Sequence, residues 1–183
     1  MKIQETKLKG CFLIEPTVFH DERGYFFESF NQLVFEKAVG HKVDFVQDNQ
    51  SFSKKGVIRA LHFQKGDYAQ AKLVRAVQGI VLDVAVDLRP NSETFGQHIA
   101  AELSAENKKQ LYIPRGFAHG FATLSETSEF AYKCDNFYHK EAEGGIIYND
   151  PTLKIDWKIA SEDVIIAEKD RTLPLFKNFF SIK

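Results

Sequence analysis

The amino-acid sequence predicts an all-β fold. Its apolar residues mostly recur with a period of two, helix signals are few, and the 17 Phe and six Tyr suit a β-rich core. About ten short strand candidates at regular spacing indicate a sandwich or a closed barrel, with the jelly roll as the favoured form. The interior of such a barrel is the natural place for a pocket.

The clearest strand candidate is IVLDVAVDLR, residues 80–89. Val84 and Val86 alternate there with Asp83 and Asp87, a pattern that predicts a strand with one buried face. The other strand candidates, bounded mostly by turn residues, are 10–19, 24–30, 43–48, 57–64, 71–77, 96–103, 109–113, 119–124 and 129–137.

Residues 71–77 and 80–89 are separated by a short stretch that ends in Gly79, and we expect the two strands to form a hairpin. A two-residue loop would place Lys72 opposite Asp83. A bulge at Gly79 would shift the register and remove that pairing.

One helix is predicted, over NQLVFEKAVG, residues 31–40. Leu33 and Val39 have helical spacing, Asn31 can cap the first turn, and Gly40 can end the helix. A short helical turn is expected after Ser161. Because the 183 residues contain no repeat and no linker-like run, we expect a single domain over 1–183.

Composition excludes several classes of function. A formal charge of -1 offers no global field for nucleic acid or an anionic membrane, so we expect neither as a partner. The N-terminus has no apolar signal region, and no run approaches the ~20 apolar residues of a membrane span, so a cytoplasmic protein is expected. Cys11 and Cys134 are far apart, which suits a reducing compartment and argues against structural zinc.

Several polar residues gain meaning only as a set. Gln47 and Asn49 would face the same way on an extended chain, although a solvent-facing loop explains these two residues better when they are taken alone. Arg59 and His62 in RALH are three residues apart, so one cavity can hold both only if the strand twists or bulges between them. His62 alone would more often be a satisfied core histidine than a catalyst.

Three further candidates are equally ambiguous when taken singly. In LYIPRGFAHGF, residues 111–121, a turn is expected to deliver His119 at the head of the next strand, unless this histidine is simply on the surface. Tyr132 lies in a predicted strand, where tyrosine is usually packing, and Asp170 could simply form a turn.

Together, these stretches resemble the dTDP-4-dehydrorhamnose 3,5-epimerase family. The resemblance runs in the same order from about residue 8 to about residue 175, on DERGYFFESF, FVQDNQS, RALHFQ, AKLVRAVQG, VLDVAVDLR, TFGQ, LSAENK, LYIPRGFAHGF, EFAYKC, YNDP and EKD. It implies a cupin-type jelly-roll β-barrel with a few short helices, a homodimer, and no metal or organic cofactor. The implied reaction epimerises C3 and C5 of dTDP-4-dehydro-6-deoxy-D-glucose through enolates, in dTDP-L-rhamnose biosynthesis.

The resemblance also implies a role for each matching residue. His62 is the expected base that removes a proton beside the sugar ketone, and Asp170 orients it. Lys72 is expected to stabilise the enolate oxygen, and Tyr132 to return a proton on the opposite face. The residues implied to hold the nucleotide, diphosphate or sugar are Arg23, Glu28, Gln47, Asn49, Arg59, His119 and Glu143, with Phe19, Phe26 and Tyr138 as further contacts to base or sugar.

The sequence departs from the family pattern at two positions. Ala60 stands where the family usually has glycine, so the backbone beside His62 has to accept a Cβ, with strain if that residue needs a positive φ. Arg115 occupies a variable loop position and is expected to alter the pocket rim.

Three alternative functions stay open at this point. An epimerase acting at C3 or C5 only would differ in product configuration, and Tyr132 weakly favours the double epimerase. A metal-dependent cupin would need clustered ligands such as H-x-H, whereas RALHF and FAHGF each offer a single histidine. A sugar-binding module without activity would bind the ligand without exchanging its protons.

Overall fold

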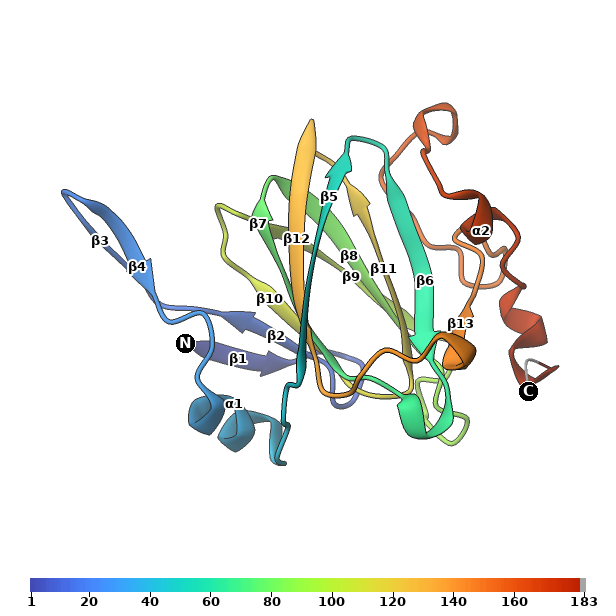
Figure 1. The fold of residues 1–183 in the computed structure, drawn as a ribbon, viewed down its shortest axis with the longest axis horizontal. Helices are drawn as coiled ribbons and strands as arrows, with labels where there is room; N and C mark the ends of the chain where they lie inside the picture. The colour runs from blue at the N-terminus through green and yellow to red at the C-terminus, as the bar shows by residue number, and fades with distance from the viewer. Residues whose placement is uncertain (182–183) are drawn as a thin grey trace.

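The computed structural model describes residues 1–181, which form two antiparallel β-sheets packed into a sandwich (Figure 1). The six-stranded sheet has the order β1 (Lys2–Glu5), β2 (Phe12–Glu15), β10 (Gln110–Ile113), β7 (Lys72–Gln78), β12 (Thr127–Cys134), β5 (Gln47–Lys54). The five-stranded sheet has the order β13 (Glu143–Gly145), β6 (Ile58–Gln64), β11 (Phe117–Thr123), β8 (Ile80–Asp87), β9 (His98–Ser104). The predicted all-β jelly-roll class is confirmed, with two open sheets in place of a closed barrel.

The remaining elements lie around the sandwich. Two strands, β3 (Val18–Asp21) and β4 (Gly24–Phe27), form a separate hairpin that extends away from it (Figure 1). The helices are α1 (Gln32–Val39) and α2 (Glu168–Arg171), with 3-10 turns at Gly66–Tyr68, Lys140–Ala142, Ser161–Asp163 and Phe176–Ser181. No helix among the described residues is long and apolar enough to span a membrane.

Strand β8 is buried on both faces, so the prediction of one buried face was wrong. Val81 and Ala85 pack between the two sheets, and Asp83 and Asp87 are fully buried on alternate positions of this same face. On the other face, Val84 packs in a second core cluster that contains residues of the C-terminal segment. The sequence of this strand alternates like that of a half-exposed strand because two of its buried positions are aspartates.

The predicted hairpin between β7 and β8 does not form, because the two strands belong to different sheets. Gly79 has φ +73°, and a Cβ there would lie 2.1 Å from the Thr127 carbonyl oxygen, so glycine lets the chain cross between the sheets. Lys72 and Asp83 are therefore not cross-strand neighbours. β7 pairs instead with β10 and β12, and β8 pairs with β9 and β11.

Helix α1 confirms the predicted capping. Asn31 accepts a hydrogen bond from the Val34 amide at 3.2 Å, and Gly40 takes the left-handed conformation at φ 81°. The expected helical turn after Ser161 also forms. Other boundaries were wrong: residues 43–46 form no strand, and 10–19 divides into β2 and β3, while β1, β13 and α2 were not predicted.

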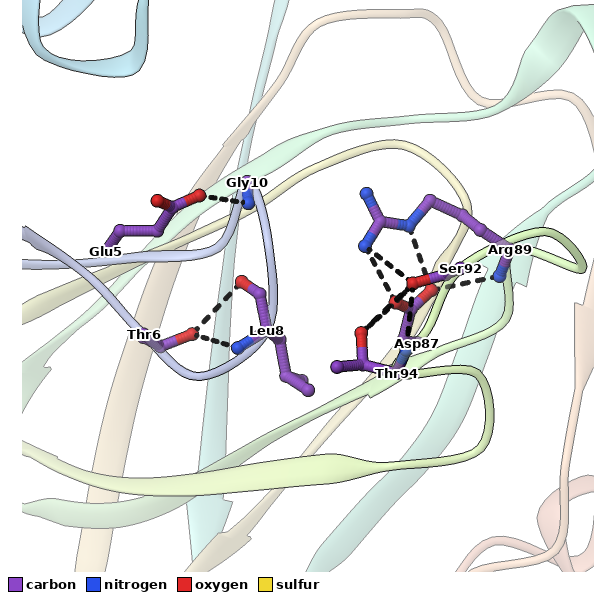
Figure 2. A network of polar contacts seen from close by, with 8 residues as sticks. All are labelled: Glu5, Thr6, Leu8, Gly10, Asp87, Arg89, Ser92 and Thr94. Carbon is purple, nitrogen blue, oxygen red and sulfur yellow. Dashed lines mark hydrogen bonds and ion pairs between the residues drawn. The ribbon is translucent and has the colours of Figure 1, made fainter.

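A polar network holds the chain at the end of β8 (Figure 2). The buried Asp87 carboxylate accepts hydrogen bonds from Arg89 Nε at 2.9 Å, Ser92 Oγ at 2.6 Å and Thr94 Oγ1 at 2.7 Å. Burial alone would raise the pKa of Asp87, but these hydrogen bonds lower it to about 2. The network therefore fixes the turn that leads toward β9.

Candidate active site

A cavity of about 450 Å³ lies between the two sheets. One wall is formed by β5, β7 and β12 of the six-stranded sheet, and the other by β6 and β11 of the five-stranded sheet. The predicted site residues that line it are Gln47, Asn49, Arg59, His62, Lys72, His119, Tyr132, Tyr138, Glu143 and Asp170. Residues from Gln47 to Asp170 in the sequence thus converge on one space within the fold.

The expected bulge in β6 brings Arg59 and His62 to the same cavity. Arg59 pairs with Phe121 and His62 with His119, so three steps along β6 match two steps along β11. Ala60 lies within this bulge and is not among the residues with positive φ. The backbone strain that a Cβ would cause at a positive φ is therefore absent. Its methyl group is accommodated opposite Gly120, where an added Cβ would lie 2.5 Å from the Ala60 Cβ.

His62 forms a dyad with Asp170. The His62 Nε2 lies 3.1 Å from Asp170 Oδ2, and the aspartate is buried. A carboxylate at Nε2 fixes the proton on that nitrogen and leaves the lone pair on Nδ1. Nδ1 is shielded from solvent, has no hydrogen-bond partner among residues 1–181, and lies 3.8 Å from Glu143 Oε1. This ring has the arrangement of a general base.

The C-terminal segment positions Asp170. Ile165 exchanges backbone hydrogen bonds with Gly56 and Ile58, which docks the segment onto the start of β6. α2 follows directly and carries Asp170 to His62. Just after α2, Leu173 packs closely against Gly145 of β13, where an added Cβ would lie 2.7 Å from the leucine side chain.

Lys72 and Tyr132 face the cavity from neighbouring strands β7 and β12. The Lys72 Nζ lies 5.8 Å from the centre of the Tyr132 ring. Burial lowers the pKa of Lys72 and raises the pKa of Tyr132, so the phenol stays protonated at neutral pH. The Tyr132 hydroxyl has no hydrogen-bond partner within the described chain, which leaves it available to a ligand.

His119 lies in the middle of β11, so its predicted place at the head of the strand was wrong. Its Nε2 is 2.8 Å from Asp83 Oδ2, and both residues are buried. Burial lowers the pKa of His119, although the Asp83 charge and hydrogen bond act in the opposite direction. The sequence reading missed Asp83 as a site residue because it treated this position as strand surface.

Strand β5 presents alternate polar side chains to the cavity. Gln47 Nε2 donates to Asn49 Oδ1 at 3.0 Å, which confirms that the two residues face the same way. Ser51 continues this row, and its buried hydroxyl has no partner in the part of the chain described. Arg59 is anchored beside it by a hydrogen bond from Nε to Ser53 Oγ at 3.1 Å. Period-two alternation from Gln47 could have identified Ser51.

A charged cluster forms one edge of the cavity. Glu143 Oε2 accepts from the Tyr138 hydroxyl at 2.8 Å, and Glu143 Oε1 accepts from Lys169 Nζ at 3.2 Å. Burial acts to raise the pKa of Glu143, but these two donors lower it overall. Lys169 was not predicted, although its place next to Asp170 offered a signal.

Four predicted residues, Phe19, Arg23, Phe26 and Glu28, lie outside the cavity, on or just after the β3–β4 hairpin. Phe19 and Phe26 are cross-strand neighbours and are 62% and 71% exposed. Among the described residues, Arg23 forms its ion pair locally, with Asp21 at 2.6 Å. Within one chain, these side chains do not reach the site.

Arg115 does not line the cavity, so its expected effect on the rim was wrong. Its Nε donates to Asp135 Oδ2 at 2.8 Å. Asp135 Oδ1 in turn accepts from the Ala71 amide at 2.6 Å, next to Lys72. Arg115 therefore braces the start of β7 from outside.

The fold and the site together define a protein of the jelly-roll type whose cavity holds side chains suited to proton transfer. A histidine–aspartate dyad and a tyrosine face one cavity from opposite sheets, and Lys72 faces it from β7, the strand next to that of the tyrosine. Within residues 1–181, no group of three His, Cys, Asp or Glu side chains is arranged to hold a metal ion.

Comparison with known proteins identifies the family. A family model described as dTDP-4-dehydrorhamnose 3,5-epimerase matches residues 5–178, and the chain belongs to this family. The Pseudomonas aeruginosa enzyme of that name is 55% identical over 171 residues, covering 93% of each chain.

Two solved structures extend the similarity to three dimensions. The dTDP-4-dehydrorhamnose 3,5-epimerase of Elizabethkingia anophelis is 61% identical, with a TM-score of 0.94 over 97% of each chain. The dTDP-6-deoxy-D-glucose-3,5-epimerase of Legionella pneumophila, in complex with dTDP-4-keto-L-rhamnose, is 46% identical, with a TM-score of 0.93 over 100% of this chain and 94% of that one.

Proposed function

We propose that this protein epimerises C3 and C5 of dTDP-4-dehydro-6-deoxy-D-glucose to give dTDP-4-dehydro-L-rhamnose. Family membership supports this reaction, and the ligand of the Legionella relative corresponds to its product. The observation that carries the mechanism is the placement of His62 and Tyr132 on opposite sheets, facing one cavity. An epimerase needs a base and a proton donor on opposite faces of the sugar.

The first step removes a proton from a carbon next to the C4 ketone. The His62 imidazole takes this proton, and the electron pair of the C–H bond moves into an enolate. Asp170 stabilises the resulting imidazolium. Lys72 stabilises the enolate oxygen, an effect worth on the order of 3 kcal/mol for a preorganised donor in a water-poor site.

The second step adds a proton from the other face. The Tyr132 hydroxyl donates to the carbon, the enolate collapses to the ketone, and the centre is inverted. Solvent then restores the tyrosine and removes the proton from His62. One proton leaves and one arrives, so electrons balance at each centre. The same ketone activates C3 and C5, and the two inversions need only that the ring presents each carbon in turn.

The test follows label from deuterated water into the product. With wild-type enzyme we expect deuterium at both C3 and C5 and the L-rhamno configuration by NMR. His62→Ala should lose incorporation at both carbons. Inversion at one centre only would replace the proposal with a single-centre epimerase, and wild-type exchange in His62→Ala would reject the assigned base.

We further propose that the active form is a homodimer in which the β3–β4 hairpin of one chain completes the site of the other. The hairpin extends away from its own sandwich (Figure 1). Its exposed Phe19 and Phe26 form an apolar pair suited to a base or sugar, and Arg23 at its tip suits a diphosphate. Glu28 follows at the base of the hairpin.

A further inference from the structure

The cavity contains a second histidine–aspartate pair beside the catalytic dyad. His119 and His62 are direct cross-strand partners on β11 and β6. Each has Nε2 against a buried aspartate: Asp83 at 2.8 Å for His119 and Asp170 at 3.1 Å for His62. The reaction proposed above uses only one of these pairs as a base.

The free nitrogen of His119 faces the cavity. Nδ1 has no hydrogen bond within residues 1–181, and it is not among the polar atoms that are closed off from solvent without a partner. His62 Nδ1, in contrast, is closed off. The His119 ring packs nearly parallel to Phe130, with centroids 6.0 Å apart, which holds its plane.

Charges around His119 favour the uncharged ring. The charged or titratable groups near it are Asp83 from β8, Lys72 from β7 and His62 from β6. Burial and the Lys72 charge both oppose protonation of the imidazole, and they outweigh Asp83. Because Nε2–H donates to Asp83, the neutral ring has its lone pair on Nδ1.

We infer that Asp83 is a positioning residue that holds His119 as the Nε2–H tautomer, so that Nδ1 accepts a hydrogen bond from a hydroxyl of the bound hexulose. The inference rests on the proposed function for its ligand. A lone pair repels a phosphate oxygen, so His119 recognises the sugar and not the diphosphate. The ring hydroxyls near the ketone are those on C2 and C3, since C5 carries a methyl group.

The tautomer can be measured without substrate. Long-range ¹H–¹⁵N NMR of histidine-labelled protein at pH 7 should show His119 protonated at Nε2 only. The His119→Gln variant assigns its signals, and Asp83→Asn should move the proton to Nδ1, since the amide can donate to Nε2. A wild-type His119 with its proton on Nδ1, or on both nitrogens, overturns the inference.

Substrate analogues test the hydroxyl. Deuterium exchange at C5 is compared for the parent nucleotide sugar and its 2-deoxy and 3-deoxy analogues. In wild-type enzyme, one analogue should lose roughly tenfold in kcat/KM, the size expected for one hydrogen bond. Equal rates for all three substrates in wild-type enzyme contradict the inference, even if Asp83→Asn does not fold.

Two variants separate positioning from proton transfer. In Asp83→Asn, the difference between the parent and the sensitive analogue should disappear. In the matched variant Asp170→Asn, exchange should slow for every substrate while the difference persists. Discrimination that survives in Asp83→Asn contradicts the role of Asp83. Failure of the wild type to exchange protons on the parent rejects the proposed function instead, and leaves the NMR result standing.

Discussion

Replacing Tyr132 by Phe should separate proton exchange from inversion. The change removes one hydroxyl that has no hydrogen-bond partner in residues 1–181 and leaves the ring packing against the Phe130 cluster intact. Because no internal hydrogen bond is lost, we expect the free energy of unfolding to change by less than about 0.5 kcal/mol. His62 and Lys72 keep their places and can still form the enolate.

The expected kinetic effect is much larger. Loss of a positioned proton donor typically costs roughly 10²- to 10⁴-fold, or about 3 to 5 kcal/mol in the barrier to inversion. Without the hydroxyl, His62 returns a proton to the face from which it came. The variant should therefore incorporate deuterium at C5 without inverting that centre.

The assay compares two rates on one sample. NMR in deuterated water reports label at C5, and product configuration reports inversion, while urea unfolding checks stability. The matched control is Tyr148→Phe, outside the cavity, which should retain both rates. Inversion at the wild-type rate in Tyr132→Phe, or equal loss of exchange and inversion, would refute the assignment of Tyr132 as the donor on the opposite face.

Three further predictions concern the framework and the assembly. Asp87 has a folded-state pKa of about 2, below its ordinary 3.8. The charged carboxylate therefore stabilises the fold by about 2 kcal/mol above pH 4, and this stabilisation is lost as the pH falls through 2. Asp87→Asn should remove this part of the pH dependence of the free energy of unfolding, measured with urea. Gly120→Ala would place a Cβ 2.5 Å from that of Ala60 and should lower stability by roughly 1 to 3 kcal/mol and slow exchange. Co-expressing inactive Arg23→Ala and His62→Ala chains should restore about a quarter of the wild-type activity, because half of randomly mixed dimers then hold one intact site of two.

Each of these predictions has a contradicting outcome. Parallel pH curves for wild type and Asp87→Asn would reject the assigned carboxylate, and Glu106→Gln, at an exposed carboxylate, serves as control. An unchanged melting temperature in Gly120→Ala would show that the bulge has more room than the structure indicates. Mixed Arg23→Ala and His62→Ala chains that stay inactive would place Arg23 in the site of its own chain.

Local chemistry explains what the sequence could predict. The cap residues of α1 act within one turn of the chain, so Asn31 and Gly40 were sufficient to predict both helix ends. The bulge in β6 followed from strand periodicity, since Arg59 and His62 could not otherwise share a cavity. The resemblance then brought together residues that no local rule connects, such as His62 and Asp170.

Long-range pairing explains what could not be predicted. Gly79 looked like a hairpin turn, but β7 pairs with β10 and β12, far along the chain, and β8 pairs in the other sheet with β11 and with the strand that follows it, β9. Asp83 looked like a solvent-facing position until the second sheet and His119 covered it. The resemblance predicted that Arg23 binds the substrate. Only the three-dimensional structure shows that the hairpin carrying Arg23 lies away from the cavity of its own chain.

The most direct test of the mechanism is a crystal structure of the protein with a dTDP-linked hexose that lacks the ketone. We expect the pyranose in the cavity, with C3 and C5 toward the His62 imidazole on one face and the Tyr132 hydroxyl beyond the other face. A sugar bound outside the cavity, or one with both side chains on the same face, would contradict the account.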